Sequence, residues 1–362
     1  MPKTVASNGK FPFMSIWLLL WAVLAGAEAS PASDGPQVSI RGKDFYLNGS
    51  PWLPKGVKVE AFNRPILPSL PDWANKSAKE ARCWYGPAEL NAAKNVFGAN
   101  VIRFAVSQPA LDPQSPIYDR NYLQETLDAI RLARSAGFVV IPSMDAQAEN
   151  GISNLPAWPN DSTVRAWQTL APSLIHDQGV MFELFDEPDK SSKAQSRKEW
   201  AHSMQSLIDI VRSLGSTNIL LLDGLWWARS TNELFPLVHD TLPNHLALAV
   251  HPYLVKDFFV TEKQWHDHFG ASAAKYPLIA TEWNATPTNG CVGPTTPDIA
   301  LSLMRYLESL HVGLIGWAID SNSGKLVKDH TSYAPSDYAT FTDCKDNSIS
   351  GGGRLLAKYP ND

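Results

Sequence analysis

The stretch Val180-Met181-Phe182-Glu183-Leu184-Phe185-Asp186-Glu187-Pro188 is an apolar run that ends in two acids and a proline. It predicts a buried strand that stops before Pro188, because proline has no N–H to donate to a sheet. Asp186 and Glu187 would then lie at the carboxyl end of the strand, where α/β barrels carry their functional groups. The alternative is a helix N-terminus, where acidic residues are also common.

A second stretch of the same kind favours the strand. Pro277-Leu278-Ile279-Ala280-Thr281-Glu282-Trp283-Asn284 is another short apolar run that ends in a glutamate. Further strands are predicted at 55–59, 101–106, 138–144, 218–223, 246–251 and 313–319, alternating with helices at 87–97, 123–135, 163–175, 197–214, 261–274 and 297–310. Eight such units predict parallel strands, and their number favours a (β/α)8 TIM barrel over a doubly wound open sheet.

The first 29 residues have the features of a signal peptide. Lys3 and Lys10 precede the apolar residues 13–25, and Ala27-Glu28-Ala29 matches an A-x-A cleavage site. The apolar core is short for a membrane-spanning anchor, which is the alternative. We therefore expect a secreted protein, extracellular or periplasmic, with a flexible lead at 30–37 and one domain over 38–362.

Two features lie outside the repeating units. Residues 38–40 and 44–47 alternate around Gly42-Lys43 and are followed by Asn48-Gly49, which predicts a small N-terminal β-hairpin at one end of the barrel. Residues 60–86 are rich in proline and tryptophan and are predicted to be a long loop without regular structure.

Composition excludes several partners. The net charge of −5 offers no basic surface for nucleic acid, and no later segment is long and apolar enough to span a membrane. The nine histidines form no HExxH motif, so we expect no metal and no other cofactor, and we expect a monomer. Export permits a disulfide, for which Cys291 and Cys344 are the preferred pair over Cys83 because both lie in loop-like sequence.

The candidate site residues follow the strands in a fixed order: Arg103 at the second, Glu187 at the fourth, His251 and Tyr253 at the sixth, Glu282 at the seventh and Trp317 at the eighth. This order, with Phe182 to Pro188, His251-Pro252-Tyr253 and Thr281-Glu282-Trp283, resembles the cellulase family of glycoside hydrolases over about residues 38–358. That is family 5 of the clan of retaining (β/α)8 glycosidases.

The resemblance implies a secreted retaining β-glycosidase that acts on a β-linked polysaccharide or oligosaccharide, like an endo-β-1,4-glucanase or a mannanase. The alternatives are an exo-acting β-glucosidase or β-1,3-glucanase on the same barrel, and a barrel that binds polysaccharide without cleaving it. By resemblance Glu187 is the acid/base and Glu282 the nucleophile. A retaining enzyme holds two such carboxyl groups about 5–5.5 Å apart, with the acid protonated and the nucleophile ionised.

Arg103 lies among apolar residues in its strand, where a charge needs a partner. By resemblance it supports Glu282; the alternative is a structural pair with Glu183, which shares a face with Glu187 by the two-residue period of a strand and is expected to be a core carboxylate. The resemblance also implies that His251 faces the substrate and that Tyr253 hydrogen-bonds the nucleophile.

Three tryptophans are candidate sugar platforms, because a sugar ring binds well to a flat aromatic face. By resemblance Trp317 lies under the sugar at the cleavage point, with a core aromatic as the alternative. Trp226 and Trp227 follow the fifth strand and are candidate outer sugar sites, or simple packing residues.

Two positions depart from the family pattern. Asp186 stands where the family usually has an asparagine that meets the sugar 2-hydroxyl. After the third strand, where the family often has a histidine, this chain has Asp145 and Gln147, either of which could occupy that space. Both departures lie beside the expected cleavage point and indicate a divergent subfamily.

Overall fold

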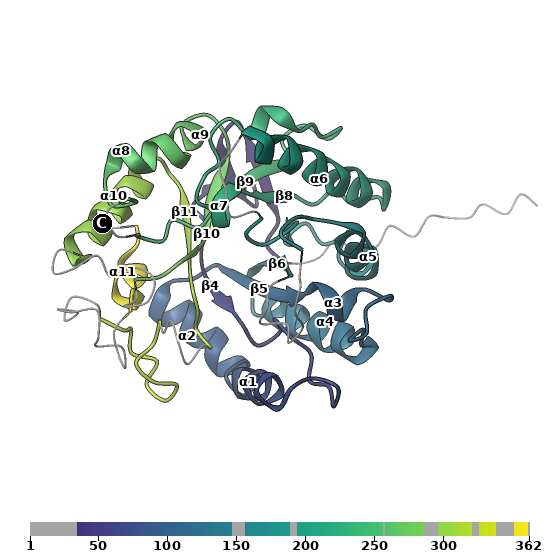
Figure 1. Cartoon of the computed structure of the whole chain (residues 1–362). Helices are drawn as coiled ribbons and strands as arrows, with labels where there is room; N and C mark the ends of the chain where they lie inside the picture. Colours follow the sequence, from purple (N-terminus) through teal and green to yellow (C-terminus); the bar gives the residue numbers. More distant parts are fainter. Residues whose placement is uncertain are drawn as a thin grey trace, which may run out of the picture. The chain divides into compact units, whose positions relative to one another are not determined.

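A computed structural model describes residues 35–146, 156–188, 194–255, 258–285, 296–320, 326–337 and 351–360. Eight parallel strands close into a barrel in the order β10-β11-β4-β5-β6-β7-β8-β9 (Figure 1). Its strands are β4 (Lys55–Val59), β5 (Val101–Ser107), β6 (Val139–Asp145), β7 (Phe182–Glu183), β8 (Leu220–Asp223), β9 (Leu246–Val250), β10 (Leu278–Trp283) and β11 (Gly313–Gly316). The predicted TIM barrel is confirmed.

Helices surround the strands (Figure 1). The α-helices are α1 (Asp72–Cys83), α2 (Pro87–Phe97), α3 (Gln108–Leu111), α4 (Arg120–Ser135), α5 (Asp161–Leu170), α6 (Ala194–Ser213), α7 (Leu225–Ala228), α8 (Glu262–Trp265), α9 (Ala271–Ala273), α10 (Thr296–Ser309) and α11 (Gly353–Lys358). Shorter turns are the 3-10 helices η2 (Ala171–Ser173) and η3 (Phe235–Leu237) and the π-helix η4 (His266–Gly270). In the described part of the chain, no helix is long and apolar enough to cross a membrane.

A small antiparallel sheet covers one end of the barrel. It has three strands, β1 (Val38–Arg41), β2 (Asp44–Leu47) and β3 (Ser50–Trp52), and not the two of the predicted hairpin. The third strand forms because Asn48-Gly49, with φ of 51° and 80°, turns the chain a second time. Buried side chains of this sheet pack against the first inward-facing residues of the barrel strands, such as Val101. The sheet therefore closes the end opposite to the carboxyl ends of the strands.

The prediction of a structureless loop over 60–86 is wrong, because α1 occupies its second half. Pro71 precedes the helix and Asp72 supplies a negative charge in its first turn, where both residues are favourable. Ala74 and Ala78, one turn apart, are buried. The buried face of the helix consists of alanines, so the sequence showed no clear helical period of apolar residues in this proline-rich stretch.

The strand that begins at Val180 is shorter than predicted, since β7 covers only Phe182–Glu183. The backbone beyond it stays bonded to the barrel: Leu184 N–H donates to the Leu221 carbonyl at 3.1 Å and Asp186 N–H to that of Met144 at 2.9 Å. The alternative of a helix N-terminus at this point is therefore wrong, and the two acids leave the barrel at its carboxyl end.

Several predictions fall wholly or largely on residues outside the described ranges. These are the signal peptide at 1–29, most of the lead at 30–37, Gln147, and the pair Cys291 and Cys344. Cys83 is described, and it is exposed and free.

Candidate active site

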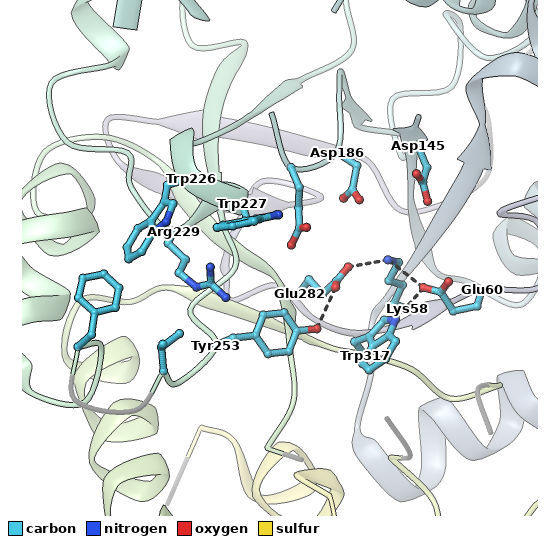
Figure 2. Close-up of a pocket in the computed structure, with 13 residues that line it drawn as sticks. Lys58, Glu60, Asp145, Asp186, Trp226, Trp227, Arg229, Tyr253, Glu282 and Trp317 are labelled. Atoms are coloured by element: carbon cyan, nitrogen blue, oxygen red, sulfur yellow. Dashed lines mark hydrogen bonds and ion pairs between the residues drawn. The ribbon is translucent and has the colours of Figure 1, made fainter. Parts of the chain in front are cut away.

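A cavity of about 550 Å³ opens where the barrel strands end (Figure 2). It brings together seven of the nine predicted site residues and Asp145; Arg103 and His251 lie beneath it, in contact with its acids. Its lining consists of Lys58, Glu60, Asp145, Asp186, Glu187, Trp226, Trp227, Arg229, Tyr253, Val255, Phe258, Glu282 and Trp317.

Glu282, near the end of β10, is bound by three donors. Its Oε2 accepts from Lys58 Nζ at 2.6 Å and from Arg103 Nη1 at 2.7 Å, and its Oε1 accepts from Tyr253 Oη at 2.9 Å. Burial opposes ionisation of this carboxyl, but Lys58, His251 and Arg103 outweigh it and lower its pKa from 4.5 to about 2. Glu282 is therefore ionised at any ordinary pH.

Lys58 was not among the predicted site residues. It is buried in β4, with 4% of its surface exposed, and its ammonium joins Glu282 to Glu60, whose Oε1 lies 2.8 Å from Nζ. Glu60 in turn accepts from the indole Nε1 of Trp317 at 2.8 Å. The position of the Trp317 ring and the charge of the nucleophile candidate are thus linked through one lysine.

Arg103 contacts three carboxylates, among them both of its expected partners, Glu282 and Glu183. Its Nε donates to Glu183 Oε2 at 2.5 Å, and other nitrogens bind Glu282 and Asp186. It has no exposed surface, and Nη2 also donates to Ser143 Oγ at 3.0 Å. Asp186 therefore lines the cavity and pairs with the cation that also supports Glu282.

Glu187 follows β7 in a left-handed backbone conformation, with φ of 50°. Its N–H donates to Asp223 Oδ2 at 2.9 Å, and its Oε1 lies 2.9 Å from His251 Nδ1. Burial raises the pKa of Glu187, and although His251 acts against this, Asp186 and Glu282 add to the rise. One oxygen of Glu187, one of Glu282 and a ring nitrogen of His251 lie within 4.8 Å of one another.

Hydrogen bonds fix which His251 nitrogen carries a proton. Thr281 Oγ1 donates to Glu183 Oε1 at 2.8 Å, so it can only accept from His251 Nε2, 3.1 Å away. Nε2 is therefore protonated, and one further proton is shared between Nδ1 and Glu187. Burial opposes the charge on His251, but Asp223, Glu183 and Glu187 raise its pKa well above the ordinary value.

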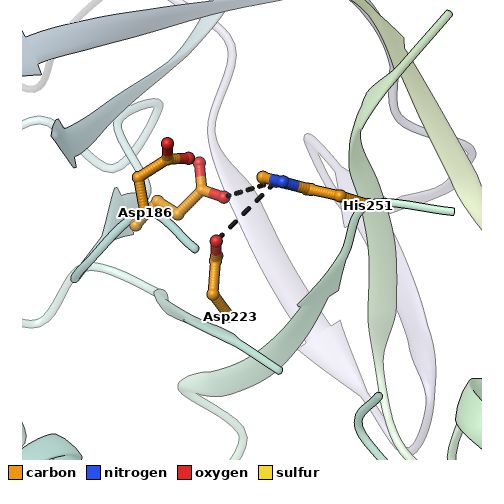
Figure 3. A group of neighbouring side chains, drawn as sticks. Asp186, Asp223 and His251 are labelled. Atoms are coloured by element: carbon orange, nitrogen blue, oxygen red, sulfur yellow. Dashed lines mark ion pairs between the residues drawn. The ribbon is translucent and has the colours of Figure 1, made fainter. Parts of the chain in front are cut away.

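Asp223, at the end of β8, was also missed. It is fully buried, with Oδ2 3.7 Å from His251 Nε2 (Figure 3). Among the described residues Asp223 Oδ1 has no hydrogen-bond donor, and neither lysine nor arginine pairs with this carboxyl. Burial, reinforced by the nearby charge of Glu183, raises the pKa of Asp223 well above its usual range and favours the uncharged acid, while the charge of His251 acts in the opposite direction.

Element α7, directly after β8, carries Trp226 and Trp227 and is followed by Arg229; its backbone departs from that of an α-helix. Trp226, Trp227 and Ala228 are left-handed, with φ of 60°, 53° and 55°. Each such residue costs of order 1–3 kcal/mol and persists only where the surroundings enforce it. Here Leu225 N–H donates to the Ser230 carbonyl at 2.8 Å, and the reverse bond is 3.0 Å. Both indoles are half-buried and face the cavity.

At the position where the family often has a histidine, the structure places Asp145, which is buried at the edge of the cavity. Gln147, the other candidate for that space, lies outside the described residues.

Among the residues that the structure describes, two groups of donor atoms lie close enough to hold a metal ion: Glu183, Asp186, Asp223 and His251, and Glu187, His251 and Glu282. Neither group fits one. Arg103 already binds Glu183 and Asp186, and both nitrogens of His251 are engaged. A divalent ion would have to displace a guanidinium and break the bonds of the imidazole.

The barrel and its two facing carboxyl groups, one with a raised and one with a lowered pKa, are those of a glycoside hydrolase. The model of the family described as cellulase (glycosyl hydrolase family 5) matches residues 59–323. The chain belongs to this family.

Individual proteins similar to this chain in sequence or in structure include a curated endoglucanase and several solved glucanases. A manganese dependent endoglucanase of Phanerodontia chrysosporium is 28% identical over 175 residues, which are 44% of each chain, so the match spans less than half the length of that curated relative. A beta-glucanase from Saccharophagus degradans, solved in complex with cellotetraose, has a TM-score of 0.65 at 20% identity and covers 85% of this chain and 91% of its own. The catalytic domain of Thermobifida fusca endoglucanase Cel5A, also with cellotetraose, has a TM-score of 0.61 at 14% identity over 89% and 96%. These two structures show the fold.

Proposed function

We propose that the protein is a secreted, retaining, endo-acting β-glycosidase that hydrolyses a β-1,4-linked glucan through a covalent glycosyl-enzyme. The observation that carries the proposal is the pair Glu187 and Glu282: oxygens within 4.8 Å across one cavity, with pKa values displaced in opposite directions. Two carboxyl groups with opposite protonation are what double displacement requires.

In the first step Glu282 attacks the anomeric carbon, and Glu187 gives its proton to the departing glycosidic oxygen. Lys58, Arg103 and Tyr253 keep Glu282 ionised and hold its two oxygens in place. The proton of Glu187 is the one shared with His251 Nδ1. Burial of Glu187 beside two acids favours the protonated form that this step needs.

In the second step Glu187, now a carboxylate, takes a proton from a water that attacks the anomeric carbon and releases Glu282. The proton taken from the water restores the hydrogen bond between Glu187 Oε1 and His251 Nδ1, which lie 2.9 Å apart. Trp317, held by Glu60, offers an aromatic face for the sugar at the cleavage point.

Asp186 changes the contact to the sugar 2-hydroxyl that we expect at this position. An asparagine amide would donate to that hydroxyl, whereas an ionised carboxylate can only accept from it. Because one Asp186 oxygen already binds Arg103, the carboxylate is fixed in orientation.

A glucan is favoured as substrate because the two structural neighbours named above bind cellotetraose and the curated relative is an endoglucanase. The manganese dependence of that relative is not carried over, because the donor atoms here are already engaged.

The test is hydrolysis of a panel of β-1,4-glucan, β-mannan and β-1,3-glucan with reducing-end detection, with proton NMR of the first products. We expect internal cleavage of the glucan and β-configured products. Glu282→Ala should be inactive, with the surface variant Glu80→Ala as control, and a 2-fluoro-glycoside should label Glu282. Release of single sugars would favour an exo-acting enzyme. Binding of the polysaccharide without turnover would favour a non-catalytic barrel. Label on another carboxylate would refute the assignment of Glu282 as the nucleophile.

A further inference from the structure

Arg229 is a cavity-lining cation that the mechanism does not use. Its guanidinium carbon lies 5.3 Å from the ring centre of Trp226 and 5.5 Å from that of Trp227. The backbone before it is hydrogen-bonded to the next strand, since His251 N–H donates to the Ala228 carbonyl at 2.9 Å, and the left-handed turn directs the two indoles and Arg229 toward one space (Figure 2).

No acid of the described residues forms an ion pair with Arg229. Lys58 and Arg103 each contact at least two carboxylates, but no ion pair includes Arg229, and its Nε is buried without an acceptor. Burial lowers the pKa of Arg229, and Glu187 and Tyr253 only partly offset this. A guanidinium with five N–H donors in a fixed plane is suited to a carboxylate, which it can bind through two parallel hydrogen bonds.

Charges are segregated across the cavity. Lys58, Glu60 and Asp145 lie on one side of Glu282, and Arg229 lies with Trp226 on the other side (Figure 2). Aromatic and apolar residues, including Val255 and Phe258, line much of the Arg229 end, and Glu187 is the acid near enough to act on its charge. An anionic sugar would be repelled at the acidic end and attracted only at the end that holds Arg229.

We propose that Arg229, between Trp226 and Trp227, forms a binding site for a sugar residue that carries a carboxylate, so that the substrate is a β-glucan containing uronic acid. The indoles contact the apolar faces of the ring and the guanidinium binds the carboxylate. This inference rests on the proposed glycosidase function and adds the substrate class at one end of the cavity.

The test compares a cello-oligosaccharide with the same oligosaccharide partly oxidised at C6 to the carboxylate. We expect the wild-type enzyme to have a kcat/KM at least about tenfold higher for the oxidised substrate, because a charge-assisted bidentate bond is gained. This ratio should fall as salt is raised. Mass spectrometry of the products should place the carboxylated residue at one fixed position relative to the cut.

Variants then identify the group responsible. In Arg229→Met the ratio of the two kcat/KM values should fall to about one, whatever happens to each value. In Arg229→Lys, which keeps the charge but loses the planar fork, it should be intermediate. Arg197→Met, which removes an exposed arginine paired with Glu233, is the control and should keep the wild-type ratio.

A wild-type ratio of one or less, or a ratio that survives in Arg229→Met, overturns the inference. The inference is also overturned if the position of the carboxylated residue relative to the cut varies from product to product. Failure to cleave either oligosaccharide would instead count against the proposed function, so the two failures are distinguishable.

Discussion

Replacing Lys58 with methionine should move the acidic limb of the pH–rate profile. Methionine fills the space of the lysine stem but has no charge. Lys58 Nζ lies 2.6 Å from Glu282 Oε2 and supplies the strongest of the attractions that lower the pKa of Glu282 from 4.5 to about 2. Removing a close opposite charge typically returns about 1–3 pKa units. Since Arg103 remains at 2.7 Å, we expect the pKa of Glu282 to rise to between about 3 and 5.

The direction of this pH shift follows from the role that we propose for Glu282. The proposed nucleophile, Glu282, works only as a carboxylate, so we expect kcat/KM to fall as the pH drops through the pKa of Glu282 in the free enzyme. A rise of about 1–3 units moves that limb upward by the same amount, which is about 1.4–4 kcal/mol of lost preference for the ionised form. Near neutral pH Glu282 stays ionised in the variant, so the loss is concentrated at low pH.

The assay is kcat/KM against pH on an aryl β-glycoside with a good leaving group, which makes the proton of Glu187 unnecessary and isolates the nucleophile. Circular dichroism at each pH shows whether the protein is folded. Lys55→Met is the matched control: Lys55 lies on the same strand, but its Nζ donates to the Ala357 carbonyl at 3.0 Å, away from Glu282. An acidic limb that coincides with the wild type in folded Lys58→Met would refute the reasoning.

Substitutions at three further residues test the proposed acid/base side of the site. Glu187→Ala should slow hydrolysis of poor leaving groups far more than of activated aryl glycosides, and azide should restore part of the rate; an equal loss without rescue would contradict the assignment. Asp186→Asn removes a charge that raises the pKa of Glu187, so the alkaline limb of kcat/KM should move downward by roughly one unit, and an unmoved limb would argue against this. Asp223→Asn should stay within about threefold of the wild-type kcat/KM, because an amide keeps the acceptor for Glu187 N–H and mimics the neutral acid, whereas Asp223→Ala should lose at least about tenfold. Similar losses in both Asp223 variants would indicate that the acid is ionised.

The barrel could be predicted from the sequence because apolar strands ending in acids recur with a helix between them. Glu187 and Glu282 were found by that pattern, and Asp223 ends the same kind of run at Leu220–Asp223. It was missed because no family motif drew attention to it. Local sequence also shows no difference between an acid that will be ionised and one that burial keeps neutral.

Lys58 could have been found by the argument that singled out Arg103. Both are cations on buried strands, and a buried charge needs a partner. Glu60 and Arg229 carried no such signal, since neither lies within a strand. Their importance depends on which side chains the closed barrel brings near them, and sequence spacing does not determine this. The same limit applies to α1, whose buried face consists of alanines.

The three-stranded sheet has a practical consequence for handling the enzyme. Val38 and Ile40 pack against the first residues of the barrel strands, at the far end of the barrel from the cavity. A tag, a resin linker or a fused carbohydrate-binding module joined ahead of Val38 would leave the cavity facing solvent. Immobilisation through that side should therefore preserve access for long, insoluble chains, whereas attachment through the exposed surface around Trp226 and Trp227 would obstruct it.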